Sequence, residues 1–263
     1  MAGGDGVVNE VFKLKMASAK EFRNALNAIA TLIDEGAFLI DPEGLKLRAM
    51  DPSRIAMVDF MWGRSVFDEF EAPEEGAKLC LNIGELLKLL RKAGKDESIE
   101  LGLDEATGRL KVVMRGRYTK SFTIPRLEAT GEEAPGELKI PFDAKVTLDA
   151  KELRKAIADA ALIADFVKIS ADGGKLVLSA EGEVSSATIE FPRDCEAVLD
   201  FDVKAASTAT FDTSMLEKML KAGSNLADIV TIEFSTNKPI KLDFRLPYEG
   251  KLVFYLAPRV EAE

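Results

Sequence analysis

The feature that most constrains this chain is an internal repeat. The stretch AKEFRNALNAIATLID, residues 19–34, returns 131 positions later as AKELRKAIADAALIAD, residues 150–165. Further along, the tripeptide KAG at residues 92–94 returns at residues 221–223. A duplicated unit is expected to fold in the same way in each copy. We therefore predict two similar domains in the 263 residues.

Each half is predicted to contain two helices separated by strands. Apolar residues at helical spacing indicate helices over 19–34 and 150–165, and two more are expected at about 84–93 and 213–222, each ended by a glycine. Between them, apolar and charged residues alternate, which is typical of half-buried strands. The alternating apolar positions are Phe12, Leu14, Met16, Leu110, Val112, Met114, Leu242, Phe244, Leu246, Leu252, Phe254 and Leu256. The expected fold class is α+β.

A polar stretch separates the two halves. Residues 126–141, RLEATGEEAPGELKIP, contain Gly, Pro and four Glu, and they interrupt both periodicities. We predict an N-terminal tail over 1–10, a first domain over 11–125, a connector over 126–141 and a second domain over 142–263.

Composition excludes several kinds of chemistry. The chain has no histidine and two cysteines, so it lacks histidine-based catalytic groups and cysteine-rich zinc sites. We expect no catalytic residue, no metal and no cofactor. No apolar run approaches the length of a membrane span, and the N-terminus lacks the pattern of a secretory signal. A soluble, intracellular protein without a membrane partner is expected.

Positive charge is concentrated on the predicted helices. The chain carries a net charge of −10, which argues against coating nucleic acid with its whole surface. The rest of the chain carries −13, whereas a net charge of +3 falls on the four helical windows, residues 19–34, 84–95, 150–165 and 213–228. Lys and Arg are also common on solvated helix faces. The return of Lys20 and Arg23 as Lys151 and Arg154 favours a face that recognises a repeating polyanion.

Three motifs resemble a known family. They are LRAMDPSRI at residues 47–55, LLKLLRKAG at 86–94 and YLAPRV at 255–260. With the duplicated halves and the acidic connector, the chain resembles the sliding clamps of the proliferating cell nuclear antigen (PCNA) type, particularly those of archaea. The resemblance implies a trimer that forms a six-domain ring, with helices inside around duplex DNA and sheets outside. It also implies DNA polymerase, clamp loader, flap endonuclease and DNA ligase as partners, which bind through short hydrophobic motifs.

The resemblance also assigns roles to residues. The expected DNA-binding residues are Lys20, Arg23, Lys88, Arg91, Lys92, Lys151, Arg154, Lys155, Lys218 and Lys221. The expected partner-binding residues are Met50, Ile55, Leu127, Leu138, Pro239, Tyr255, Ala257 and Pro258. Strand alternation also places Tyr255 on the face opposite Leu252, Phe254 and Leu256, so we expect it to be exposed.

The expected subunit joint pairs two edge strands, residues 109–117 of one copy and 185–191 of the next. Its residues are Lys111, Val113, Arg115, Arg117, Ser185, Thr188, Ile189 and Phe191.

Two other functions stay open at this point. A carboxylate-metal hydrolase is one, because 45 acidic residues make some acidic cluster inevitable. A clamp-like scaffold that does not encircle DNA is the other. A clamp would be found in the cytoplasm, associated with the nucleoid, in an archaeon and in the nucleus in a eukaryote.

Overall fold

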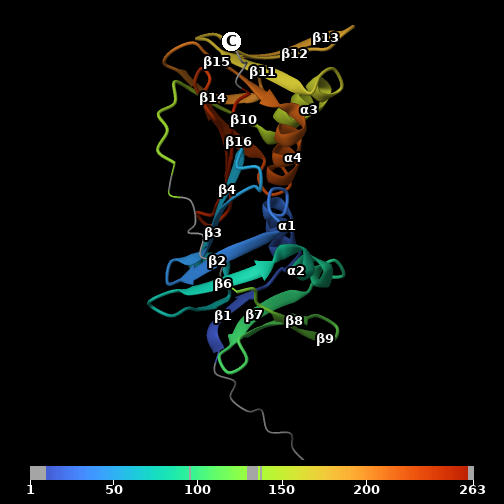
Figure 1. The fold of residues 1–263 in the computed structure, drawn as a ribbon, viewed down its shortest axis with the longest axis vertical. Coiled ribbons are helices and arrows are strands. Elements are labelled where there is room, and N and C mark those ends of the chain that lie inside the picture. Colours follow the sequence, from blue (N-terminus) through green and yellow to red (C-terminus); the bar gives the residue numbers. More distant parts are fainter. Residues whose placement is uncertain (1–9, 95, 129–135, 137, 260–263) are drawn as a thin grey trace, which may run out of the picture. The chain divides into compact units, whose positions relative to one another are not determined.

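All four predicted helices are present in the computed structural model, which describes residues 10–94, 96–128, 136 and 138–259. They are α1 (Ala19–Ile29), α2 (Ile83–Leu90), α3 (Ala150–Ala161) and α4 (Thr213–Gly223), and a short 3-10 helix spans Arg64–Val66 (Figure 1). The expectation that glycine ends α2 and α4 is wrong. Arg91 is the C-cap of α2, and Gly223 lies buried in the last turn of α4.

The repeat is visible in the hydrogen bonds that start the helices. A side chain just before each helix accepts a backbone N–H of the first turn, and these capping residues are Ser18, Asn82, Asp149 and Asp212. The first residues of α1 and α3 also repeat a longer-range bond. Ala19 N donates to the Glu97 carbonyl and Ala150 N to the Asp228 carbonyl, each over 2.8 Å. Equivalent bonds at equal spacing in the chain agree with the predicted duplication.

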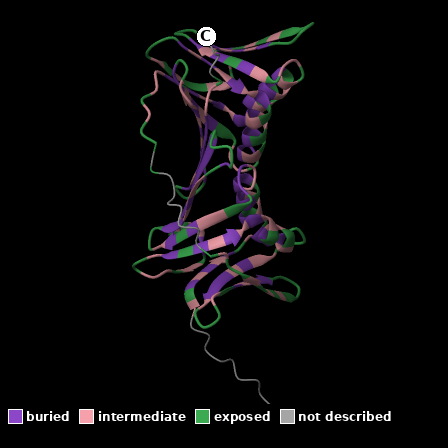
Figure 2. Ribbon diagram, in the orientation of Figure 1, coloured by how far each residue is buried: buried purple, intermediate pink, exposed green. Residues whose placement is uncertain are grey.

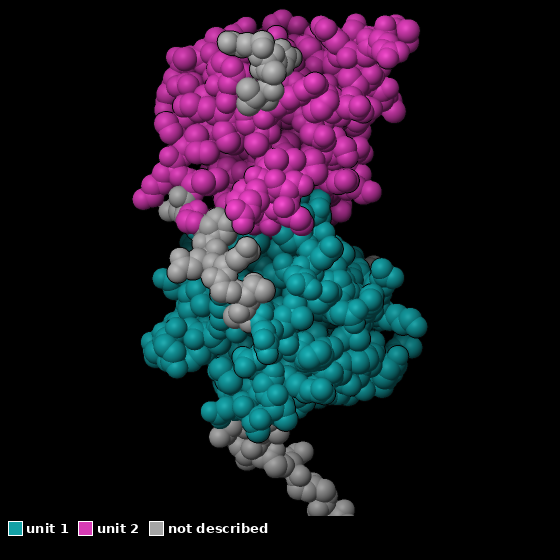
Figure 3. Space-filling model, in the orientation of Figure 1, with its two compact units in different colours: residues 1–49, 61–134, 247–250 teal, residues 50–60, 135–246, 251–263 magenta. Residues whose placement is uncertain are grey.

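The chain divides into two compact units, shown in Figure 3. Unit 1 takes the described residues of 1–49, 61–134 and 247–250, and unit 2 those of 50–60, 135–246 and 251–263. The strand β4 (Ala56–Gly63) starts in unit 2 and ends in unit 1.

Unit 1 contains an antiparallel sheet in the order β5-β1-β7-β8-β9. Its strands are β1 (Glu10–Met16), β5 (Glu69–Glu71), β7 (Ser98–Asp104), β8 (Arg109–Arg115) and β9 (Thr119–Pro125). A second run has the order β3-β2-β6, formed by β2 (Glu35–Asp41), β3 (Gly44–Met50) and β6 (Ala77–Asn82). The helices α1 and α2 contact each other in this unit.

Unit 2 has the corresponding parts. One sheet has the order β13-β12-β11-β15, formed by β11 (Phe166–Ala171), β12 (Lys175–Glu181), β13 (Ser186–Pro192) and β15 (Ser207–Asp212). The other run is β14-β10-β16-β17-β18-β4, with β10 (Ala144–Asp149), β14 (Val198–Val203), β16 (Ile229–Phe234), β17 (Ile240–Arg245) and β18 (Lys251–Leu256). The helices α3 and α4 lie side by side (Figure 1).

The predicted strand alternation is confirmed. Buried and accessible residues alternate along many of the strands in Figure 2, and all twelve alternating apolar positions named above are buried. The alternation is expected where one sheet face packs against helices and the other meets solvent.

The predicted connector is described only at residues 126–128, 136 and 138–141, which form neither helix nor strand. Its start is attached to β6, because Leu127 N donates to the Cys80 carbonyl over 2.8 Å. Of the predicted tail, residues 1–9 lie outside the described residues. None of the helices within the described ranges is long and apolar enough to cross a membrane.

Candidate nucleic-acid interface and partner site

The predicted DNA-binding residues lie on the accessible sides of the helices and just beyond them. Arg23 and Arg154 are half-buried, and the others are exposed: Lys20, Lys88, Arg91, Lys92, Lys151, Lys155, Lys218 and Lys221. The opposite faces are buried, as Phe22 and Leu26 illustrate in α1. Each helix therefore packs through one face and presents cations on another, which suits contacts to phosphate that carry no base sequence.

Several of these cations have exposed acidic neighbours. Lys88 pairs with Glu85 and Lys155 with Glu152, each over 2.6 Å, one turn apart on the same helix. The pKa of Lys155 is raised by its hydrogen bond to Glu152, so the ammonium group stays charged. Ion pairs between exposed side chains contribute little to stability, because water and salt screen them. A phosphate can therefore replace the carboxylate at little cost.

The end of α2 is held by a second ion pair. Arg91 and Lys92 follow the last helical residue, Leu90. Lys120 pairs with Glu97 over 2.7 Å and reaches the Lys92 carbonyl at 3.4 Å. The pKa of Glu97 is lowered, first by its hydrogen bond with Lys120. This pair fixes the turn that presents two of the predicted DNA-binding cations.

A buried aspartate shapes the turn that presents Ile55. The Asp51 carboxylate accepts backbone N–H bonds from Ser53, Ile55 and Ala56 over 2.7–3.1 Å. Arg54, in the same turn, has a positive φ of 58°. As a result Ile55 is 45% exposed and Met50, at the end of β3, is 39% exposed. The structure thus places two of the predicted partner-binding side chains at the surface.

The structure places Tyr255 differently from the prediction. Tyr255 is only 9% exposed and packs with Met57 and Val253, so the expectation of an exposed tyrosine is wrong. Alternation does place it opposite Phe254, but on that face the side chains of Met57, from the neighbouring strand β4, and Val253 pack with it. Burial raises the pKa of the Tyr255 hydroxyl, which stays protonated near neutral pH.

The other predicted partner-binding residues are accessible to different degrees. Ala257 lies beside Ile55, because its N–H donates to the Ile55 carbonyl over 2.8 Å. Leu138 is 40% exposed, and Leu127, Pro239, Ala257 and Pro258 are half-buried. Leu127 belongs to unit 1 and the others to unit 2. Within unit 2, the Ala257–Ile55 bond and the Met57–Tyr255 contact lie next to each other along β4 and β18.

The strand predicted for the first side of the subunit joint is wrong. Residues 109–115 form β8, which is hydrogen-bonded on both sides, to β7 and to β9. Lys111, Val113, Arg115 and Arg117 therefore belong to an interior strand and its turn. The free edge is β9, which follows β8 in a hairpin whose turn includes Gly116. On the other side β13 is an edge strand, and it contains Thr188, Ile189 and Phe191 just after Ser185.

Other chemical groups are sparse in the described ranges. Cys80 and Cys195 are both free thiols. No group of three or more Asp, Glu or Cys side chains is placed there to hold a metal ion.

Comparison with known proteins agrees with this geometry. The model of the proliferating cell nuclear antigen N-terminal domain matches residues 11–126, and that of the C-terminal domain matches residues 138–259. A relative from Pyrobaculum aerophilum, named DNA polymerase sliding clamp 1, is 38% identical and covers 94% of this chain and 98% of its own. A DNA polymerase sliding clamp from Thermococcus gammatolerans is 35% identical over 95% of this chain and 99% of its own.

Solved structures share the fold. PCNA from Thermococcus kodakaraensis superposes with a TM-score of 0.87 at 26% identity, over 94% of this chain and all of that one. A chain of the PCNA2–PCNA3 complex from Sulfolobus tokodaii gives a TM-score of 0.85 at 27% identity, over 95% of this chain and all of that one.

Proposed function

This chain belongs to the proliferating cell nuclear antigen family of DNA sliding clamps, and from this premise we propose that three copies close into a ring around duplex DNA. The observation that supports the proposal most directly is the charge distribution. The helical windows are net positive and the remainder of the chain carries −13. A basic lining with an acidic exterior guides DNA through a channel and disfavours binding elsewhere.

The duplicated fold supplies an argument for closure. Within unit 2, β4 from the first half of the chain pairs with β18 from the second half. In the order of the repeat, β13 is the counterpart of β4 and β9 is the counterpart of β18. Both counterparts are sheet edges in the single chain. Pairing β9 of one copy with β13 of the next is a head-to-tail contact, which forms a closed ring when the rotation between copies allows it.

The surface that includes the exposed Met50 and Ile55 and the adjacent Ala257 is proposed as the docking site for partner enzymes. DNA polymerase, clamp loader, flap endonuclease and DNA ligase would bind there through short hydrophobic segments. The protein would perform no reaction itself but hold these enzymes on DNA, in the cytoplasm at the nucleoid of an archaeon or in the nucleus of a eukaryote.

A topological experiment tests the encircling function. After loading by a clamp loader, the protein should stay on nicked circular DNA in high salt and leave when one restriction cut linearises the circle. A bound scaffold that does not encircle the duplex would be lost from both forms in high salt. Light scattering of the isolated chain at three times 28.7 kDa would support a ring of identical subunits.

A further inference from the structure

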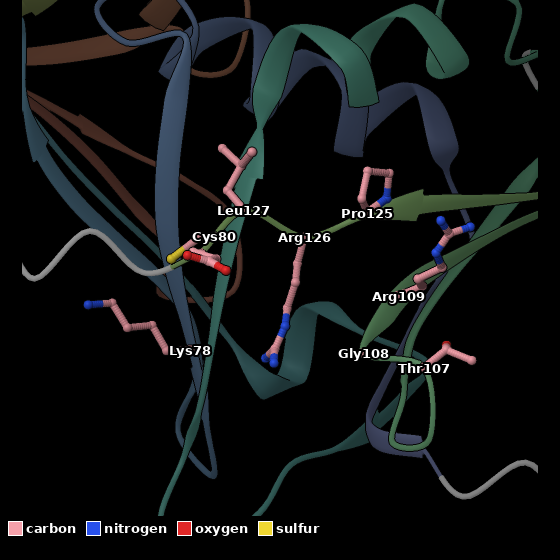
Figure 4. Close-up of a pocket in the computed structure, with 9 residues that line it drawn as sticks. Lys78, Cys80, Thr107, Gly108, Arg109, Pro125, Arg126 and Leu127 are labelled. Carbon is pink, nitrogen blue, oxygen red and sulfur yellow. The ribbon is translucent and has the colours of Figure 1, made fainter.

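Unit 1 contains a basic cavity of about 480 Å3 beside the end of β9 (Figure 4). Lys78 of β6, Arg109 of β8 and Arg126 line it, and all three are exposed. None of these three forms an ion pair with another described residue. Glu128 also lines the cavity, so the four side chains leave a net positive charge. Such a site suits an acidic group from outside the chain.

The β4–β18 pair shows how the equivalent edges would meet. Ala257 N donates to the Ile55 carbonyl over 2.8 Å at one end of the pair. At the other end, Lys251 pairs with Asp59 over 3.0 Å. Residue numbers therefore rise along β4 as they fall along β18, which makes the pair antiparallel.

The repeat transfers this register to β13 and β9. The turn before β4 is closed by Asp51 N bonding to the Ala56 carbonyl, and the turn before β13 by Gly182 N bonding to the Ser185 carbonyl. Ser185 therefore corresponds to Ala56, and Val184 to Ile55.

The strand β9 is aligned with β18 through their neighbours in the sheets, β8 and β17. Residues 240–245, IKLDFR, match residues 110–115, LKVVMR, in alternation. Ile240 is opposite Leu256, and Leu110 is opposite Ile124. Pro125 therefore corresponds to Ala257.

The transferred register puts Val184 of one copy opposite Pro125 of another and Ser186 opposite Thr123. Both Thr123 and Ser186 are exposed, whereas their neighbours Phe122 and Ala187 are half-buried. In this register exposed residues of β9 stand opposite exposed residues of β13. A shift of one residue would instead place exposed residues opposite half-buried ones. Val184 is 98% exposed in the single chain, as expected of a residue that is covered only in the assembly.

At this end the strand ladder is incomplete. Pro125 has no N–H, so it cannot repeat the bond that Ala257 gives to Ile55. Arg126 follows Pro125, and Glu183 precedes Val184, so the antiparallel register brings these two residues to the same place. We propose that the cavity lined by Lys78, Arg109 and Arg126 receives two acidic residues from a neighbouring copy, Glu181 at the end of β12 and Glu183 in the turn that follows. The proposal rests on the ring proposed above and adds its register and an ionic contact.

Disulfide trapping tests the register. In a chain with Cys80 and Cys195 replaced by Ser, a Thr123→Cys copy and a Ser186→Cys copy should cross-link on mild oxidation. Opposite residues of an antiparallel pair have Cα atoms about 4.5–5.5 Å apart, within disulfide range. The control pairs Thr123→Cys with Glu190→Cys, four residues further along β13, and should not cross-link. Trapping of the control pair instead of the first would overturn the register while leaving the ring intact.

Charge reversal tests the ionic contact. Arg126→Glu and Glu183→Arg should each raise the dissociation constant of the trimer about tenfold or more, because like charges then meet. Both changes in one chain should restore assembly. Glu196→Arg, an exposed acid outside the turn, is the matched control and should leave assembly unchanged. A trimer unaffected by the single changes, or not restored by the double change, would contradict the contact. A wild-type chain that stays monomeric would instead contradict the proposed homotrimeric ring.

Discussion

Gly223, in the last turn of α4, lies directly over the ring of Phe244 in β17. A Cβ atom at residue 223 would stand 2.3 Å from the ring, closer than any real contact allows. Phe244 is fully buried and meets Phe254 edge to face, with ring centroids 6.2 Å apart. The absence of a side chain at residue 223 therefore sets how closely the end of α4 approaches the sheet.

Gly223→Ala should destabilise unit 2 by about 1–3 kcal/mol, because the added methyl group has to displace a packed ring. Thermal unfolding followed by circular dichroism measures the change. Gly173→Ala is the control, since no atom lies within 4 Å of the site of its Cβ. Equal stability of the two variants would show that α4 shifts freely over the sheet.

Met50→Ser with Ile55→Ser should weaken binding of a polymerase-type or flap-endonuclease-type peptide by about 2 kcal/mol or more, because two apolar anchors are lost. Both residues are accessible, so the fold should stay intact, whereas truncating the buried Tyr255 would confuse binding with stability. Calorimetric titration measures the affinity. Leu39→Ser, at a residue 42% exposed in unit 1, is the control. Unchanged affinity in the double variant would place the docking site elsewhere.

Lys88, Arg91 and Lys92 changed together to Glu should reduce loading and polymerase stimulation on primed circles, most strongly at low salt, because the contacts to phosphate that are removed weaken as salt rises. Stability should change little, because all three side chains are exposed. The control reverses three exposed lysines outside the helices, Lys145, Lys168 and Lys204, and produces the same change in net charge. If both triple variants lose stimulation equally, the effect comes from net charge alone and not from the helix end.

Glu69 should titrate far below its ordinary value of 4.5. Hydrogen bonds from Lys13 at 2.8 Å and Lys15 at 2.6 Å lower the pKa of its carboxyl to about 2. A lowered pKa means that the contribution of Glu69 to stability is present above pH 4.5 and is lost as the pH falls from 4.5 toward 2. Carboxyl chemical shifts measured by NMR should show this midpoint, and a midpoint near 4.5 would mean that the ion pairs do not form in solution.

Thr123→Pro should produce a folded monomer. Thr123 corresponds to Tyr255, which lies two residues before Ala257, so the Thr123 N–H is directed toward the free edge of β9. Proline at this position therefore removes a donor to the neighbouring copy but none to β8. Phe122→Pro should instead disturb the β8 ladder and lower the unfolding temperature. Light scattering and circular dichroism distinguish the two results. A Thr123→Pro trimer would exclude β9 as the joint.

The repeat predicted most of the fold, and it failed where a boundary depends on a distant neighbour. Gly223 resembles a helix stop in sequence, but the ring of Phe244 explains its presence. Tyr255 falls on the predicted side of β18, but it is buried with Val253 and with Met57 of β4, which comes from the other half of the chain. The periodicity of a strand predicts on which face a side chain lies, but not whether other side chains bury it there.

The amino-acid sequence by itself determined the duplication, the four helices, the alternating strands, the charge on the helices and the family, because all of these depend on local spacing and composition. The tertiary structure alone decided which strand is the free edge. Residues 109–115 and 119–125 both have the pattern of strands, and only hydrogen bonding on both sides of β8 shows that β9 is left open. Edges are properties of pairing between distant segments, so they follow from the assembled sheet rather than from the pattern of any one strand.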